Sequence, residues 1–241
     1  MKPARILLAA LVCGLLASQA AAFDLSFDLG VSDRAWYRYR NETGPRLTGN
    51  VTLGTRIGDS FYINGNFWNS SQLGLTATDW VVPREQDIGL DLGYTSEFVD
   101  AGIFSTLYAI GGRTRVDLGA LVSAGVPVVG DLVSLNASLR AITDFLGFYA
   151  EARLGPSIFL PLELPLEIGV QASAGFLAGA YDGIVYNGFS HLALQPKLTA
   201  YLGKYFSLSV LGGYCFDLSG GLFPGYPFVG GLIGASLGSA D

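Results

Sequence analysis

Several residue types that support other classes of protein are scarce in this chain of 241 residues. Charged residues make up 14% of it, against roughly 25% in an ordinary soluble domain. There is one histidine, there are two cysteines, and no CxxC motif or histidine-rich tract offers a usual zinc site. Disorder needs high charge and little apolar surface, and half of this chain is hydrophobic. The composition therefore excludes a disordered protein, and we expect neither a metal site nor a cofactor.

The first 22 residues have the layout of a secretory signal peptide. Lys2 and Arg5 give a positive start, an apolar run covers residues 6–16, and three alanines at 20–22 form a small-residue cleavage site. This run is shorter than the roughly 20 residues that a membrane-spanning helix needs. A lipoprotein signal is a further alternative, but Cys13 lies inside the apolar run. We therefore expect residues 1–22 to be removed on export and residues 23–241 to form one domain.

The mature chain is acidic and has a single cysteine. Of the 241 residues, 219 remain after the loss of 22, and the 14 Lys+Arg fall to 12 without Lys2 and Arg5. Against 20 Asp+Glu the formal charge becomes −8, which leaves no basic patch for nucleic acid. Cys215 is the single cysteine of the mature chain, which excludes a disulfide within it, so stability has to come from packing and pairing of the backbone.

Apolar and polar residues alternate along most of the mature chain. From 133 to 141 the odd positions are Val, Leu, Ala, Leu and Ala, and the even positions are Ser, Asn, Ser and Arg. The stretches 23–31, 46–57 and 166–174 repeat this pattern. On a β-strand the alternation makes one apolar and one polar face, whereas on a helix the same residues would scatter. The sequence therefore predicts an all-β protein.

Counting the alternating segments predicts about twelve strands, with ten to fourteen as the range. We place them at 23–40, 46–58, 60–69, 86–94, 98–109, 114–124, 131–141, 147–155, 163–174, 190–203, 205–215 and 226–238. Short turns (58–60, 95–97, 125–130 and 203–204) alternate with longer connections (69–85, 175–189 and 216–225). Outer-membrane barrels have short periplasmic turns and longer external loops. We therefore expect a transmembrane antiparallel up-and-down β-barrel, with a bulge at Pro196.

The contents of the two faces indicate which one meets lipid. The apolar face is almost entirely Leu, Val, Ile, Ala and Phe, and Tyr37, Tyr39, Tyr94 and Tyr214 lie near strand ends, as in the aromatic belts of membrane proteins. A membrane barrel turns its apolar face outward, whereas a soluble barrel turns it inward; a secreted soluble barrel or sandwich is the alternative. The outward arrangement predicts a pore lined by charges of both signs: Arg34, Arg38, Arg56, Asp87, Asp91, Arg115, Asp117, Arg140, Glu151, Arg153, Glu167 and Lys197.

A series of short motifs runs through residues 27–108. Phe-Asp-Leu-Gly-Val-Ser-Asp at 27–33 is followed by Tyr-Arg-Tyr-Arg at 37–40, Gly-Pro at 44–45, Ser-Phe-Tyr-Ile-Asn-Gly at 60–65, and an acidic alternating strand ending in Gly-Tyr at 87–94. This order resembles the TorF-type porins of Gram-negative bacteria. Ala35-Trp36 and Asn41 depart from the family pattern. The resemblance implies an outer-membrane porin and carries over no functional residue.

Catalytic chemistry based on imidazole would have to use His191. Ser190 is adjacent to it, so on a regular strand the two side chains point to opposite faces and do not pair. No Gly-x-Ser-x-Gly elbow is present. Asp87 and Asp91 would lie roughly 13 Å apart on one strand, too far to share a proton or an ion. We therefore expect no enzyme activity and interpret His191 as a structural residue.

The leading hypothesis from the sequence is a porin-like channel in the outer membrane for passive diffusion of small polar solutes. Its partners would be outer-membrane lipids and lipopolysaccharide, with no nucleic acid. The balanced lumen charges predict little ion selectivity. The same charges would also suit ion pairs that fill the lumen, so a closed structural or interaction barrel is the alternative. A lipid-modifying barrel enzyme is a third hypothesis, and the long connections 69–85 and 175–189 have no assigned role.

Overall fold

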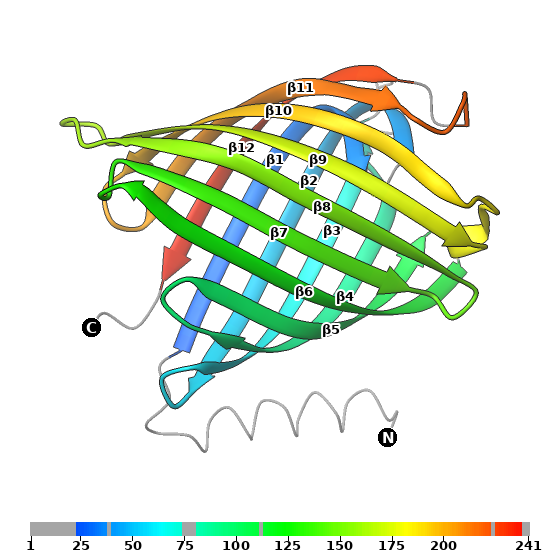
Figure 1. Cartoon of the computed structure of the whole chain (residues 1–241), viewed down its shortest axis with the longest axis horizontal. Coiled ribbons are helices and arrows are strands. Elements are labelled where there is room, and N and C mark those ends of the chain that lie inside the picture. Colours follow the sequence, from blue (N-terminus) through cyan, green and yellow to red (C-terminus); the bar gives the residue numbers. More distant parts are fainter. Residues whose placement is uncertain (1–22, 38–39, 74–80, 111–112, 223–224, 238–241) are drawn as a thin grey trace.

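The computed structural model describes residues 23–37, 40–73, 81–110, 113–222 and 225–237. Almost all of them belong to twelve strands: β1 (Phe23–Tyr37), β2 (Arg40–Ile57), β3 (Phe61–Leu73), β4 (Val81–Thr95), β5 (Val99–Ile110), β6 (Arg113–Val129), β7 (Val133–Thr143), β8 (Gly147–Leu160), β9 (Leu166–Gly179), β10 (Gly188–Leu202), β11 (Phe206–Asp217) and β12 (Tyr226–Leu237). Each strand pairs antiparallel with its neighbour in sequence, and β12 pairs with β1 to close the barrel (Figure 1). The predicted twelve-stranded up-and-down barrel is confirmed, and the expected signal peptide at 1–22 lies outside the described residues.

At one end of the barrel the strands continue beyond the residues in which apolar and polar side chains alternate. β3 continues to Leu73 and β4 begins at Val81, so much of the predicted loop 69–85 is paired strand. β9 likewise continues to Gly179, and the connection to β10 holds a single 3₁₀ turn, η1 (Tyr181–Gly183). The predicted loops are too long because the backbone pairs with a neighbouring strand whether or not its side chains are apolar. Over the described ranges, no helix has the length and apolar character to cross a membrane.

The register of β10 differs from the prediction at two places. Pro196 pairs with Val170 in the same register as the residues before and after it, so the bulge expected at Pro196 was wrong. Pairing with β11 resumes in unchanged register after this proline, so the missing N–H removes a hydrogen bond without adding a residue. The bulge lies instead between Phe189 and His191, where Ser190 is the extra residue opposite β9.

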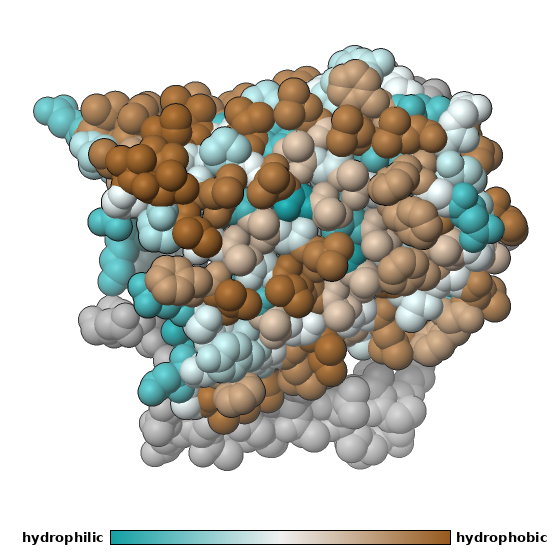
Figure 2. Space-filling model, viewed as in Figure 1, coloured by the Kyte–Doolittle hydropathy of each residue, from teal (hydrophilic) through white to brown (hydrophobic). Residues whose placement is uncertain are grey.

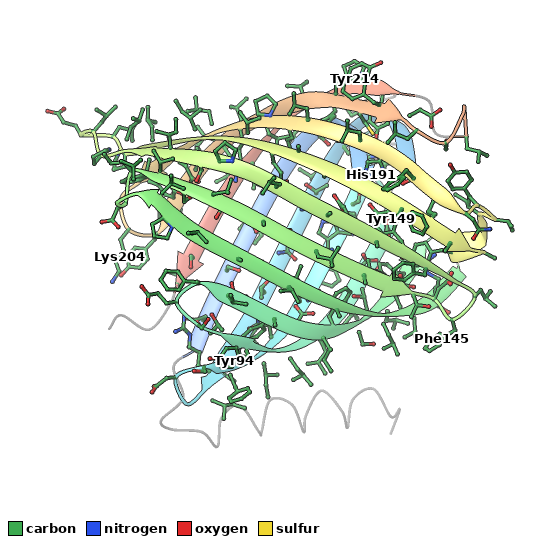
Figure 3. All side chains as sticks on the ribbon, in the orientation of Figure 1. Tyr94, Phe145, Tyr149, His191, Lys204 and Tyr214 are labelled. Carbon is green, nitrogen blue, oxygen red and sulfur yellow. The ribbon has the colours of Figure 1, made fainter. Side chains whose placement is uncertain are left out.

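The outer surface of the barrel is apolar over most of its area. Exposed aliphatic side chains such as Ile88, Ile103 and Leu118 occur on the successive strands β4, β5 and β6, and hydrophobic residues dominate the face shown in Figure 2. Exposed aromatic residues gather near both ends: Phe61, Tyr94, Phe98, Tyr205 and Phe206 near the short turns, and Phe145, Phe148, Phe189, Tyr214 and Phe216 near the other end. Figure 3 shows Tyr94 and Lys204 at one end and Phe145 and Tyr214 toward the other. This distribution is typical of a barrel surface that meets lipid between two interfaces.

Candidate functional site in the barrel lumen

Glycines on the inner wall let several large side chains lie flat against it. Tyr62 on β3 lies over Gly93 and Gly102 on the next two strands, where an added Cβ at Gly93 would be 2.3 Å from Tyr62 Cζ. Phe104 lies in the same way over Gly119, where the corresponding distance to Cζ is 2.2 Å. Glycine in a strand allows such close approach because it has no side chain. The rings therefore occupy the wall rather than the middle of the lumen.

A polar cavity of about 370 Å³ lies inside the barrel beside β2 to β7. Two carboxylates, Asp87 and Asp91, and one guanidinium, Arg140, line it. Asn66 Nδ2 donates a hydrogen bond to Asp91 Oδ2 at 3.0 Å. Arg140 Cζ lies 4.5 Å from the centroid of the Phe104 ring, a cation–π contact that holds the guanidinium at the cavity. The further lining residues are Asn50, Thr52, Tyr62, Trp68, Gly102, Ile103, Thr106 and Leu121.

A second cavity of about 350 Å³ lies nearer the short turns. Its lining includes both charge signs, with Glu97 and Asp100 on one side and Arg153 on the other, and hydroxyl and amide groups between them. Asn136 Nδ2 donates to Ser134 Oγ at 3.2 Å on the same inner face. Among the described residues, the interior therefore has a hydrophilic space in its middle and another toward the end where the described chain begins and ends.

The connection between β9 and β10 enters the opposite end of the lumen. Tyr181 in this connection is fully buried among Ile142, Tyr149 and Leu177. Its hydroxyl donates a hydrogen bond to Asp117 Oδ2 at 2.6 Å. The Tyr181 ring stacks on the Tyr149 ring, with centroids 6.1 Å apart. The loop therefore contributes an aromatic side chain to the interior.

The Arg115 guanidinium on β6 binds the same connection to the inner wall of the barrel. Arg115 Nε donates to Asp117 Oδ1 at 2.7 Å, and the Arg115 guanidinium also forms an ion pair with Asp182 beside Tyr181. The Asp182 N–H donates to Asp144 Oδ2 at 2.7 Å. We call Tyr181 and Asp182, together with their partners Arg115, Asp117 and Asp144, the loop plug. These contacts hold the connection against β6 and against the turn between β7 and β8.

Ser190 and His191 form a buried pair beside the loop plug. Ser190 Oγ lies 3.0 Å from His191 Nδ1, and both residues are completely buried. The expectation that they point to opposite faces was wrong, because a bulge places two successive residues against one partner and breaks the alternation. Gly175, opposite His191, leaves room for the imidazole: an added Cβ would be 2.3 Å from His191 Cε1. The Tyr149 and His191 rings are 6.4 Å apart between centroids (Figure 3).

The structure brings some of the predicted lumen charges together and separates others. Arg153 Nε donates to Glu151 Oε1 at 2.9 Å, and the Tyr201 hydroxyl donates to Glu167 Oε2 at 2.5 Å. Arg56 and Lys197 are exposed, Arg34 belongs to β1, and Arg38 lies outside the described residues.

Sequence reasoning missed Tyr149, Tyr181 and Asp182, because no local pattern shows that a loop folds into the barrel. Within the described part of the chain, His, Cys, Asp and Glu form no group of three that could hold a metal ion.

Comparisons with known proteins find similarity in structure and not in sequence. No family model and no curated protein matches the sequence. The COG4313 outer membrane channel from Pseudomonas putida F1 superimposes with a TM-score of 0.54 at 11% identity, over 90% of this chain and 95% of that one. The NanC porin gives 0.54 at 8% identity over 88% and 98%. LpxR from Salmonella typhimurium gives 0.57 at 9% identity over 87% and 99%. The chain therefore shares its barrel fold with outer-membrane proteins.

Proposed function

We propose that this protein is an outer-membrane, porin-like channel that passes small polar solutes, in keeping with the resemblance to TorF-type porins. The observation that carries the proposal is the pair of hydrophilic cavities inside a closed barrel whose outside is apolar and edged with aromatic residues. A lumen that served only as a packed core would have its polar face filled throughout. The shared fold with the COG4313 channel and the NanC porin supports the same reading.

The loop plug favours a restricted channel over a wide one. Tyr181 and Asp182 are held against β6 by a hydrogen bond and an ion pair, so solute has to pass beside them or displace them. Arg153 pairs with Glu151 within the wall, and Arg115 pairs within the plug. Because paired charges exert little net field on a passing ion, we expect these two pairs to add little selectivity between small cations and anions.

Recording the purified mature chain in planar lipid bilayers tests the channel. We expect discrete single-channel steps, and the absence of steps across a broad voltage range would contradict the proposal. Fractionation of expressing cells tests the location separately: the protein should sediment with outer membranes and migrate heat-modifiably in detergent gels. Recovery as a soluble periplasmic monomer would contradict the membrane assignment and leave the soluble barrel.

A second candidate function is hydrolysis by a serine nucleophile. The 3.0 Å contact between Ser190 Oγ and His191 Nδ1 favours it, because a histidine at hydrogen-bond distance is the usual base for a serine nucleophile. The complete burial of both residues weighs against it, since substrate needs access to the hydroxyl. The channel is therefore the better supported function.

A further inference from the structure

The lining of the cavity in the middle of the lumen includes two aromatic residues that are well separated along one strand. Tyr62 and Trp68 both line it and both belong to β3, six residues apart on the same face. At about 3.3 Å per residue their backbone positions are roughly 20 Å apart. Asn66 and Asp91 lie between the two rings along β3 and β4, where Asn66 pairs with Gly89 and Asp91 pairs with Asn64. The cavity therefore presents apolar ring surfaces with a polar stretch between them.

The ring of Tyr62 is placed as a flat binding surface. Its hydroxyl end lies over the backbone of Gly93 and Gly102, where an added Cβ would be 2.3 Å and 2.8 Å from Tyr62 Oη, respectively. Because this side of the ring rests on the wall, the side that borders the cavity faces the lumen. A flat apolar surface edged with a few directional polar groups is typical of sites for small organic ligands. It also suits the C–H face of a sugar ring, which is apolar while its edge carries hydroxyls.

The polar groups between the two rings are better suited to a ligand with several hydroxyl groups than to a ligand with one charged group. A carboxylate offers about four acceptor positions, so Asp91 can accept from a ligand while it also accepts from Asn66. Asn50 and Asn66 can each donate and accept, and Arg140 donates only. Thr52 and Thr106 add hydroxyls to the same lining. Such a mixture of donors and acceptors fits a molecule with several hydroxyl groups.

The charge of the cavity selects among sugars. Asp87 and Asp91 are two carboxylates, and Arg140 is one guanidinium. An anionic sugar would place a third carboxylate in a space of about 370 Å³, where like charges repel strongly. A cationic sugar would instead meet an excess of one carboxylate over Arg140, so the charge of the cavity disfavours acidic sugars only. Resting on the proposed channel function, we propose that this cavity is a binding site for a mono- or disaccharide without an acidic group, on its way through the barrel.

Maltose, as a neutral probe, tests the site on the folded mature chain in two ways. Its effect on single-channel current is measured in bilayers, and its binding is measured by calorimetry in detergent. We expect current blocks that grow with maltose concentration, and a dissociation constant about ten-fold weaker in Asp91→Asn, in line with the loss of a hydrogen bond to a charged group. Tyr62→Ala should weaken binding to a similar extent, whereas Tyr62→Phe keeps the ring and should bind nearly as the parent does. Tyr94→Ala, on the exposed outer face, is the matched control.

The outcomes separate the site from the channel. Channel steps without any maltose block or heat of binding would overturn the site and leave the channel. Maltose binding without conductance would support the site and overturn the channel. Tighter binding of galacturonate than of maltose would overturn the assignment to sugars without an acidic group. Heat-modifiable migration of each variant shows that it folds, so a loss of binding reports on the cavity.

Discussion

The hydroxyl of Tyr181 donates a hydrogen bond to Asp117 at 2.6 Å, although 64 positions separate the two residues in the chain. Asp117 also accepts from Arg115 Nε, and Arg115 contacts Asp182 next to Tyr181. The buried carboxylate therefore joins the wall of the barrel to the loop that enters it. Whether this loop limits transport depends on how firmly these bonds hold it.

Weakening the loop plug should increase conductance. Tyr181→Phe removes a hydrogen bond to a charged group, which is worth about 1.5–3 kcal/mol, and leaves the ring in place. We expect a higher mean current or longer openings in single-channel records. Tyr186→Phe is the control, because the Tyr186 hydroxyl donates to the Phe189 carbonyl at 3.1 Å beyond the plug. Identical currents from Tyr181→Phe and the parent would show that the plug does not limit flow.

Charge on the outer face should destabilise the barrel according to depth. Leu139 is exposed in the middle of β7, whereas Leu135 lies near the short turn that precedes this strand. Leu139→Arg should cost about 2–4 kcal/mol in unfolding free energy, and Leu135→Arg about 0–1 kcal/mol. Ser138→Arg, on the inner face beside the second cavity, should be tolerated. Urea titration in lipid vesicles gives the three values, and equal costs at 138 and 139 would contradict the orientation of the faces.

Adding one methyl group at Gly175 should disturb the buried Ser190–His191 pair. The new Cβ would lie 2.3 Å from His191 Cε1 and 2.7 Å from Ser190 Oγ, so Gly175→Ala forces the imidazole to move. Overpacking of this kind costs about 1–3 kcal/mol. Gly169→Ala on the same strand and face is the matched control, because its nearest neighbour would be 3.8 Å away. Equal urea midpoints for the two variants would show that the imidazole does not rest on Gly175.

Ser190 should not react as a hydrolytic nucleophile in the folded barrel. Both Ser190 and His191 are completely buried, so a fluorophosphonate probe has no path to the hydroxyl. Incubation of the folded protein followed by mass spectrometry should leave Ser190 unmodified. Labelling that disappears in His191→Gln would instead support the hydrolase and displace the channel as the leading function.

The alternation of side chains determined most of the fold without any tertiary information. Segments such as 133–141 alternate strictly, and β7 (Val133–Thr143) forms there with Leu135 and Leu139 exposed outward. The strand count followed because each segment has to pair with its neighbours to satisfy its backbone. The strand ends were less accurate at 69–85, since polar residues such as Ser70 and Ser71 join the ladder without showing an apolar pattern.

What the sequence by itself determined is the class of structure, because period-two patterning is local and is the same wherever the strand lies. The tertiary structure alone decided which inner residues meet. One extra residue at Ser190 turned two neighbours toward the same side. In the sequence this appears only as a change of the outward apolar position from odd at Phe189 to even at Leu192. The contacts of Tyr181 and Asp182 join residues 64 and 67 positions apart, and the cavity beside Tyr62 needs glycines from two other strands. Such contacts depend on how the whole barrel closes and on the register between its strands. No single segment of the sequence encodes either of these.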